Sequence, residues 1–120
     1  SIIVKGVLIE GIGKEHGKFH STLPPFQNTG YRIAERFFYP GDALTLPGKP
    51  VEILALPVAG PWSKMWEIID YALEIKPKFS FGVHEGILKD PTLGFKWPPL
   101  VLEPAGIPFQ ILELGKEYEF

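Results

Sequence analysis

The chain has 120 residues, a length that predicts a single domain over residues 1–120 with one hydrophobic core. Hydrophobic residues make up 45% and charged residues 22%, which excludes a disordered protein, and no run of residues is apolar enough to span a membrane. A net charge of −2 disfavours nucleic-acid and membrane binding, and the lack of cysteine excludes disulfides, thiolate metal sites and a cysteine nucleophile.

The beginning of the chain predicts a fragment of a longer, cytoplasmic protein. The first residues have neither the charged region nor the cleavage site of a signal peptide, and the lack of cysteine fits a reducing compartment. The only methionine is Met65, and the sequence opens within what the pattern indicates is a strand.

The first part of the chain predicts strands joined by polar segments. Apolar and β-branched residues indicate a strand over residues 1–12, and residues 31–39 predict one or two further strands. A polar loop between them carries His16 and His20. Asp42 follows a proline and a glycine, which together are a strong turn signal.

The second part predicts a strand–helix–strand unit over residues 51–84. Residues 51–58 are almost continuously apolar, which is typical of a strand buried on both faces. Apolar residues then recur at spacings of three and four over residues 61–75, which predicts one long helix with Trp62 and Trp66 packed in the core. A second strand over residues 78–83 would complete a right-handed parallel crossover.

The last part of the chain predicts little regular structure. Four prolines limit helices in residues 90–104 to a turn or two, and residues 107–114 predict a final strand. The expected fold class is therefore α/β, with one mixed sheet and one long helix.

Histidines and carboxylates at strand ends are the candidate functional residues. Asp42 and His84 each follow a predicted strand, so they can converge at one sheet edge, and His16 lies in a neighbouring loop. Imidazoles and carboxylates are the ligands that a hydrolytic zinc site needs. Residue type alone leaves other interpretations open: Asp42 as a turn residue, and the histidines as solvated or strand-end residues.

Several short segments occur in a characteristic order along the chain. They are HGKFHSTLP at 16–24, NTGY at 28–31, YPGDALT at 39–45, VEILALPVAGPW at 51–62 and FGVHEGIL at 81–88, with a closing strand at 106–116. In this order they resemble the metallo-β-lactamase superfamily, in the bacterial branch near the ascorbate-6-phosphate lactonases, which are described as zinc-dependent hydrolases.

The resemblance implies both a fold and a metal site. The fold would be half of the superfamily's αββα sandwich. The residues that match metal ligands are His16, Asp42, which would bridge two metals, and His84. The cofactor would be zinc or another divalent metal such as manganese or iron. The reaction would be hydrolysis of an ester, lactone or phosphate ester by a metal-bound hydroxide. Residues that would support the ligands or contact the small-molecule substrate are His20, Glu85 and Trp62.

One departure from the superfamily is large: its main signature, H-x-H-x-D-H, is absent. The resemblance therefore implies a C-terminal half with an incomplete metal site, no catalytic residue of its own and no activity alone. The bare inner face of the sheet would pair with the missing N-terminal half or with a second copy. The alternatives are a non-catalytic binding or assembly module of the same fold, and a small α/β domain that matches by chance.

Overall fold

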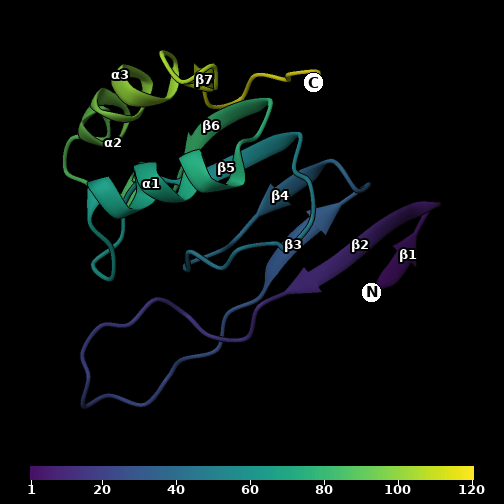
Figure 1. The fold of residues 1–120 in the computed structure, drawn as a ribbon, viewed down its shortest axis with the longest axis horizontal. Helices are drawn as coiled ribbons and strands as arrows, with labels where there is room; N and C mark the ends of the chain where they lie inside the picture. Colours follow the sequence, from purple (N-terminus) through teal and green to yellow (C-terminus); the bar gives the residue numbers. More distant parts are fainter.

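Seven strands form one mixed sheet whose order follows the chain, in a computed structural model that describes residues 1–120 (Figure 1). The strands are β1 (Ile2–Val4), β2 (Val7–Ile12), β3 (Gly30–Ile33), β4 (Phe37–Tyr39), β5 (Ile53–Pro57), β6 (Phe79–Val83) and β7 (Phe109–Gln110). The helical elements are α1 (Met65–Ile75), the 3₁₀ turn η1 (Glu85–Ile87), α2 (Thr92–Lys96) and α3 (Pro98–Leu102). The expected α/β class with one mixed sheet is confirmed.

Two tight hairpins build the antiparallel side of the sheet, β1 to β4. Lys5 and Gly6 have φ of 49° and 81°, and Ala34 and Glu35 have φ of 52° and 59°. Two consecutive residues with positive φ are typical of the turns whose twist matches that of a hairpin. The single strand expected over residues 1–12 was therefore wrong: it is two strands, split at Lys5 and Gly6.

The parallel side of the sheet, β4 to β7, contains the expected strand–helix–strand unit, β5–α1–β6. The helix begins at Met65, one turn later than the sequence predicts. The carboxylate of Glu67 accepts the backbone N–H of Lys64 at 2.8 Å, which caps this end, while residues 60–63 form a turn. The helix ends at Lys76, whose left-handed φ of 53° precedes a proline.

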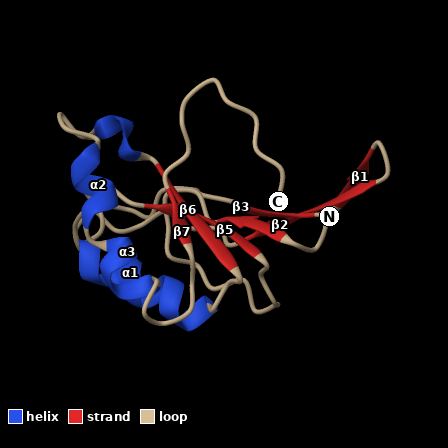
Figure 2. Ribbon diagram, turned by 90° about the horizontal axis from the view of Figure 1, so that it is seen from above, coloured by secondary structure: helices blue, strands red, loops and turns tan.

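One face of the sheet carries the main core, beneath α1 and α3 (Figure 2). The buried stripe of α1 runs through Ile68, Ile69 and Ala72, and it packs against alternate residues of β5 such as Leu54. Trp66 lies off this stripe and is 59% exposed. Its expected place in the core was therefore wrong.

The C-terminal segment, residues 111–120, arches over the opposite face of the sheet and packs on it through Leu112 and Phe120 (Figure 2). The ring of Phe120 stacks on that of Phe81, with centroids 5.7 Å apart, and Arg36 donates to its backbone carbonyl at 3.2 Å. All five residues of β5 are buried, as expected of a strand covered on both faces. The last strand is only β7, shorter than expected, because the chain leaves the sheet after Gln110 to cross this face.

The short helices α2 and α3 have five residues each, as the prolines predict. None of the helices has the length and apolar character needed to cross a membrane.

Candidate functional site

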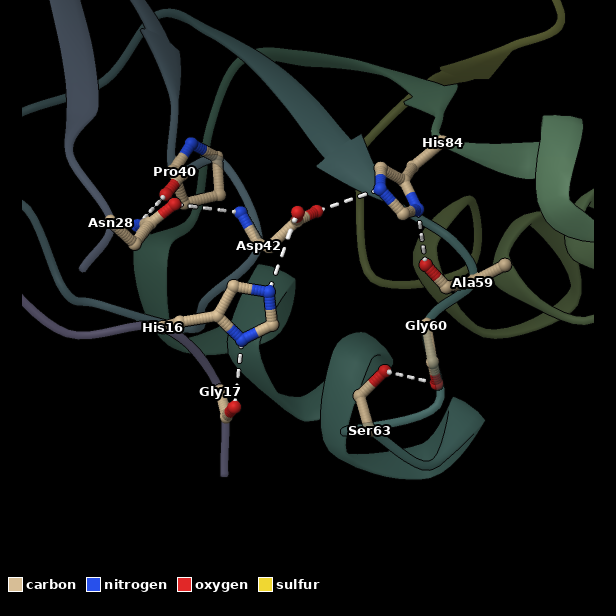
Figure 3. Close-up of polar contacts among 9 residues, drawn as sticks. All are labelled: His16, Gly17, Asn28, Pro40, Asp42, Ala59, Gly60, Ser63 and His84. Atoms are coloured by element: carbon tan, nitrogen blue, oxygen red, sulfur yellow. Dashed lines mark hydrogen bonds and ion pairs between the residues drawn. The ribbon is translucent and has the colours of Figure 1, made fainter. Parts of the chain in front are cut away.

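Three of the residues singled out in the sequence meet at one edge of the sheet (Figure 3). Asp42 lies just past β4 and His84 just past β6, and these parallel strands end on the same side, as expected. The Nε2 atom of His84 is 2.7 Å from Oδ1 of Asp42, and Nε2 of His16 is 3.4 Å from Oδ2. The carboxylate therefore stands between the two imidazoles and offers a different oxygen to each.

Both imidazoles are held from behind by backbone carbonyls. Nδ1 of His16 is 2.7 Å from the carbonyl oxygen of Gly17, and Nδ1 of His84 is 2.8 Å from that of Ala59. A carbonyl oxygen can only accept, so Nδ1 carries the proton in each ring. In the neutral imidazole, Nε2 then carries a lone pair, and in both rings this atom faces Asp42.

The two contacts of the Asp42 carboxylate differ in length. Its Oδ1 atom is buried and lies 2.7 Å from Nε2 of His84, the length of a charge-assisted hydrogen bond to a protonated ring. The contact of Oδ2 with His16 is longer than a charge-assisted hydrogen bond, which is about 2.7–2.9 Å. In neutral rings with Nδ1 protonated, both Nε2 lone pairs would face the carboxylate, and a cation between them or a proton on Nε2 would make the arrangement favourable.

Asn28 fixes the turn that presents Asp42. Its Nδ2 donates to the carbonyl of Pro40 at 2.8 Å, and its Oδ1 accepts the backbone N–H of Asp42 at 3.0 Å (Figure 3). The carbonyl of Asp42 in turn accepts the N–H of Gly17 at 2.7 Å, which ties the turn to the loop of His16. In the sequence, Asn28 stands out only by its place in the NTGY segment, so this role was not predicted.

His84 has a left-handed backbone with φ of 72°, which is uncommon for residues other than glycine. This conformation turns the chain sharply from β6 into η1 and directs the imidazole back to Ala59. Such strain is typical of functional positions.

His20 is not part of this cluster. Its Nδ1 accepts the backbone N–H of Thr22 at 3.2 Å, so its Nε2 carries the proton, the opposite arrangement to that of His16. His20, His16 and Lys18 line a hollow of about 580 Å³ enclosed by residues 15–26. His20 therefore lines a neighbouring hollow and makes no contact with Asp42.

The other expected residues lie around the cluster in different ways. The indole of Trp62 meets the His16 ring edge-on, with centroids 5.9 Å apart. Glu85 begins η1, and its backbone carbonyl accepts the N–H of Leu88. Tyr39 was not expected here: burial, and then the charge of Asp42, raise the pKa of its phenol.

The three side chains of the cluster do not form a complete metal-holding group. No group of three or more His, Cys, Asp or Glu side chains is arranged so that it could hold a metal ion by itself. The two imidazoles and the carboxylate have the donor atoms that a divalent metal takes, and Nε2 of each ring faces an oxygen of Asp42.

The chain is similar to known proteins from Mycobacterium tuberculosis and Parabacteroides distasonis. Protein Rv0786c of Mycobacterium tuberculosis is 31% identical over 109 residues, which cover 87% of this chain and 51% of that protein. A crystal structure from Parabacteroides distasonis, named as a candidate metal-dependent hydrolase, has a TM-score of 0.63 and 22% identity, and the match covers 90% of this chain and 51% of that one. No family model matches.

The chain spans about half the length of each of these two proteins. At 22% identity, the solved structure establishes a shared fold and nothing further. The chain therefore has the fold of one half of that larger protein.

Proposed function

We propose that the chain is the C-terminal part of a metal-dependent hydrolase of the metallo-β-lactamase type, and that His16, Asp42 and His84 are metal ligands. The observation that carries the proposal is the pair of Nε2 atoms that face Asp42 from two imidazoles anchored through Nδ1. Metal-ligating histidines commonly donate their other ring N–H to a carbonyl in this way. The name of the Parabacteroides distasonis protein agrees with this function.

The donor atoms restrict the choice of metal. Imidazole nitrogen and carboxylate oxygen suit zinc, and also manganese or iron, while the chain offers no thiolate. Since Asp42 turns a different oxygen to each histidine, it is arranged to bridge two ions. The remaining ligands would come from the part of the protein that precedes this chain.

The substrate would be an ester, a lactone or a phosphate ester. A divalent metal, when bound, lowers the pKa of water toward ~7 and polarises a carbonyl or phosphoryl group. The residues of this chain would orient the substrate: the hollow beside His16 offers the Nε2–H of His20 and the ammonium group of Lys18 to substrate oxygens.

A partner segment would complete the fold. The second sheet face carries Ile53, Ala55 and Phe81, and residues 111–120 cross it here. We infer that the N-terminal part of the protein, or a second copy, packs against this face and displaces part of that segment. The two larger relatives, of which the chain spans half, support the first of these partners.

The alternative is a non-catalytic binding or assembly module of the same fold. It is favoured by one observation, namely that the chain's own side chains do not form a complete metal-holding group. In that case, Asp42 would pair with protonated histidines and serve the stability of the sheet edge.

The test uses the intact protein and, in parallel, the 120-residue chain. Zinc content, zinc affinity against a chromophoric chelator, and hydrolysis of p-nitrophenyl acetate and p-nitrophenyl phosphate are measured. The hydrolase proposal expects the intact protein to bind zinc and to lose turnover of at least one ester on chelation. It expects His84→Ala to abolish both zinc binding and ester turnover, and His20→Ala to retain zinc binding. An intact protein without divalent-metal affinity would favour the module.

A further inference from the structure

The indole of Trp62 fills the space between the loops that carry the candidate ligands. Trp62 lies in the turn of residues 60–63, which the N–H of Ser63 closes on the carbonyl of Gly60 at 3.3 Å. A Cβ added at Gly17 or at Gly60 would lie less than 3.0 Å from atoms of this ring. Neither glycine has a positive φ, so the backbone conformation does not require glycine at these positions. Glycine is required because a side chain there would overlap the indole.

The backbone on one side of the ring holds two of the three candidate ligands. The carbonyl of Gly17 accepts Nδ1–H of His16 at 2.7 Å, and its N–H donates to the carbonyl of Asp42 at 2.7 Å. The indole packs against this same residue and also meets the His16 imidazole edge-on. A shift of the ring would therefore shift both His16 and Asp42.

The backbone on the other side holds the third candidate ligand. Gly60 directly follows Ala59, whose carbonyl accepts Nδ1–H of His84 at 2.8 Å (Figure 3). The indole atoms nearest to a Cβ at Gly17 are Cε3, Cδ2 and Cγ, and those nearest to a Cβ at Gly60 are Nε1, Cε2 and Cδ1. The indole thus packs against both loops.

We propose that Trp62 is a positioning residue that sets the separation of His16 and His84 across Asp42. Packing alone gives no reason for an indole here, since its Nε1–H is buried without a hydrogen-bond partner, which costs free energy. A phenylalanine ring has no N–H to leave unsatisfied, but it lacks the second ring of the indole, whose Cε3 atom is the nearest to a Cβ built at Gly17. The functional role of Trp62 rests on the proposed metal centre, while the contacts of its indole do not depend on that proposal.

The first test compares Trp62→Phe with Trp66→Phe in the intact protein. Trp66 is on the same stretch of chain but is 59% exposed, so it serves as a matched control. Zinc affinity in Trp62→Phe is expected to fall roughly tenfold, the low end of the effect of residues that orient ligands, and that of Trp66→Phe to stay unchanged. Equal zinc affinities in the two variants and the wild type would overturn the proposal.

A second test asks whether the ring acts through Gly17. Gly17→Ala introduces a methyl group into the space of the indole and is expected to weaken zinc binding by roughly tenfold or more. In a Trp62→Leu background, where the space is free, the same change is expected to have little further effect. If the two substitutions reduce the affinity independently, their effects multiply and the proposed contact is wrong.

A third measurement needs neither a variant nor a metal. Nuclear Overhauser contacts from the Trp62 indole are expected to both Gly17 and Gly60 Hα protons in the metal-free wild type, together with slowly exchanging Nδ1 protons of His16 and His84. Trp62→Phe is expected to speed the exchange of both Nδ1 protons. Absence of the contacts in the wild type overturns the proposal. Their presence in a protein without zinc affinity retains the positioning role and removes the proposed function.

Discussion

Nε2 of His84 lies 2.7 Å from Oδ1 of Asp42, while Nδ1 of the same ring lies 2.8 Å from the carbonyl oxygen of Ala59. The carbonyl of Ala59 accepts a hydrogen bond from Nδ1–H, so that in a neutral ring Nε2 carries the lone pair. His16 repeats this arrangement with Gly17. Two lone pairs are thus directed at one carboxylate, which is unfavourable unless positive charge is supplied.

Asp42→Asn removes the negative charge of the side chain and keeps its shape. The amide of Asp42→Asn can donate to an Nε2 lone pair, so the metal-free variant is expected to be as stable as the wild type or more stable. Zinc affinity is expected to fall by at least about 100-fold, because a ligand is lost. Thermal unfolding and chelator competition measure the two effects, and a clear loss of metal-free stability would contradict the repulsion.

Asn28→Ala removes both hydrogen bonds that fix the turn of Asp42. The free energy of unfolding is expected to fall by about 1–3 kcal/mol, the cost of two ordinary hydrogen bonds. Zinc affinity is expected to fall about 10–100-fold, although Asn28 is no ligand. Thr29→Ala, at the exposed next residue, is the control and should change neither quantity.

His84→Asn tests the left-handed backbone. Asparagine tolerates a positive φ better than most residues, so the variant is expected to keep the thermal midpoint of the wild type. Its zinc affinity is expected to be lost, since the amide cannot replace Nε2. His84→Val is the contrasting variant: a β-branched residue at φ of 72° is expected to lower stability by about 1–3 kcal/mol. Equal stability of the two variants would contradict the strain.

The ion pairs of Glu10 are expected to make the stability of the protein sensitive to acid. Hydrogen bonds from Lys49 and then Arg32 hold the pKa of its carboxyl below the ordinary 4.5. A depressed folded-state pKa stabilises the protein above the unfolded pKa, and this contribution is lost as the pH falls through the folded pKa. Glu10→Gln is therefore expected to be less stable than the wild type at neutral pH, with a smaller loss on acidification. Urea unfolding between about pH 7 and about pH 3 measures this slope.

The sequence predicts the strand–helix–strand unit well because its signals are local. Continuous apolar residues define β5, and apolar spacing of three and four defines α1. The helix start was missed because it depends on the capping contact of Glu67 with Lys64, which competes with the favourable Pro61. The split of residues 1–12 was missed because Lys5 adopts a positive φ, which its residue type does not predict.

The candidate site was predictable in part. The positions of Asp42 and His84 after parallel strands indicate convergence, and the structure brings them together. The role of Asn28 depends on contacts over 12 and 14 residues of chain, which residue type does not reveal. The separation of His20 from the cluster likewise depends on its contact with Thr22.

The most direct measurement of the central claim is a long-range ¹H–¹⁵N spectrum of the histidine rings in the intact protein, recorded during titration with zinc. We expect His16 and His84 to have Nδ1 protonated and Nε2 unprotonated, with both Nε2 resonances shifting as zinc is added, and His20 to show the opposite tautomer and no shift. Fully protonated rings for His16 and His84 at neutral pH, unchanged by zinc, would contradict the account.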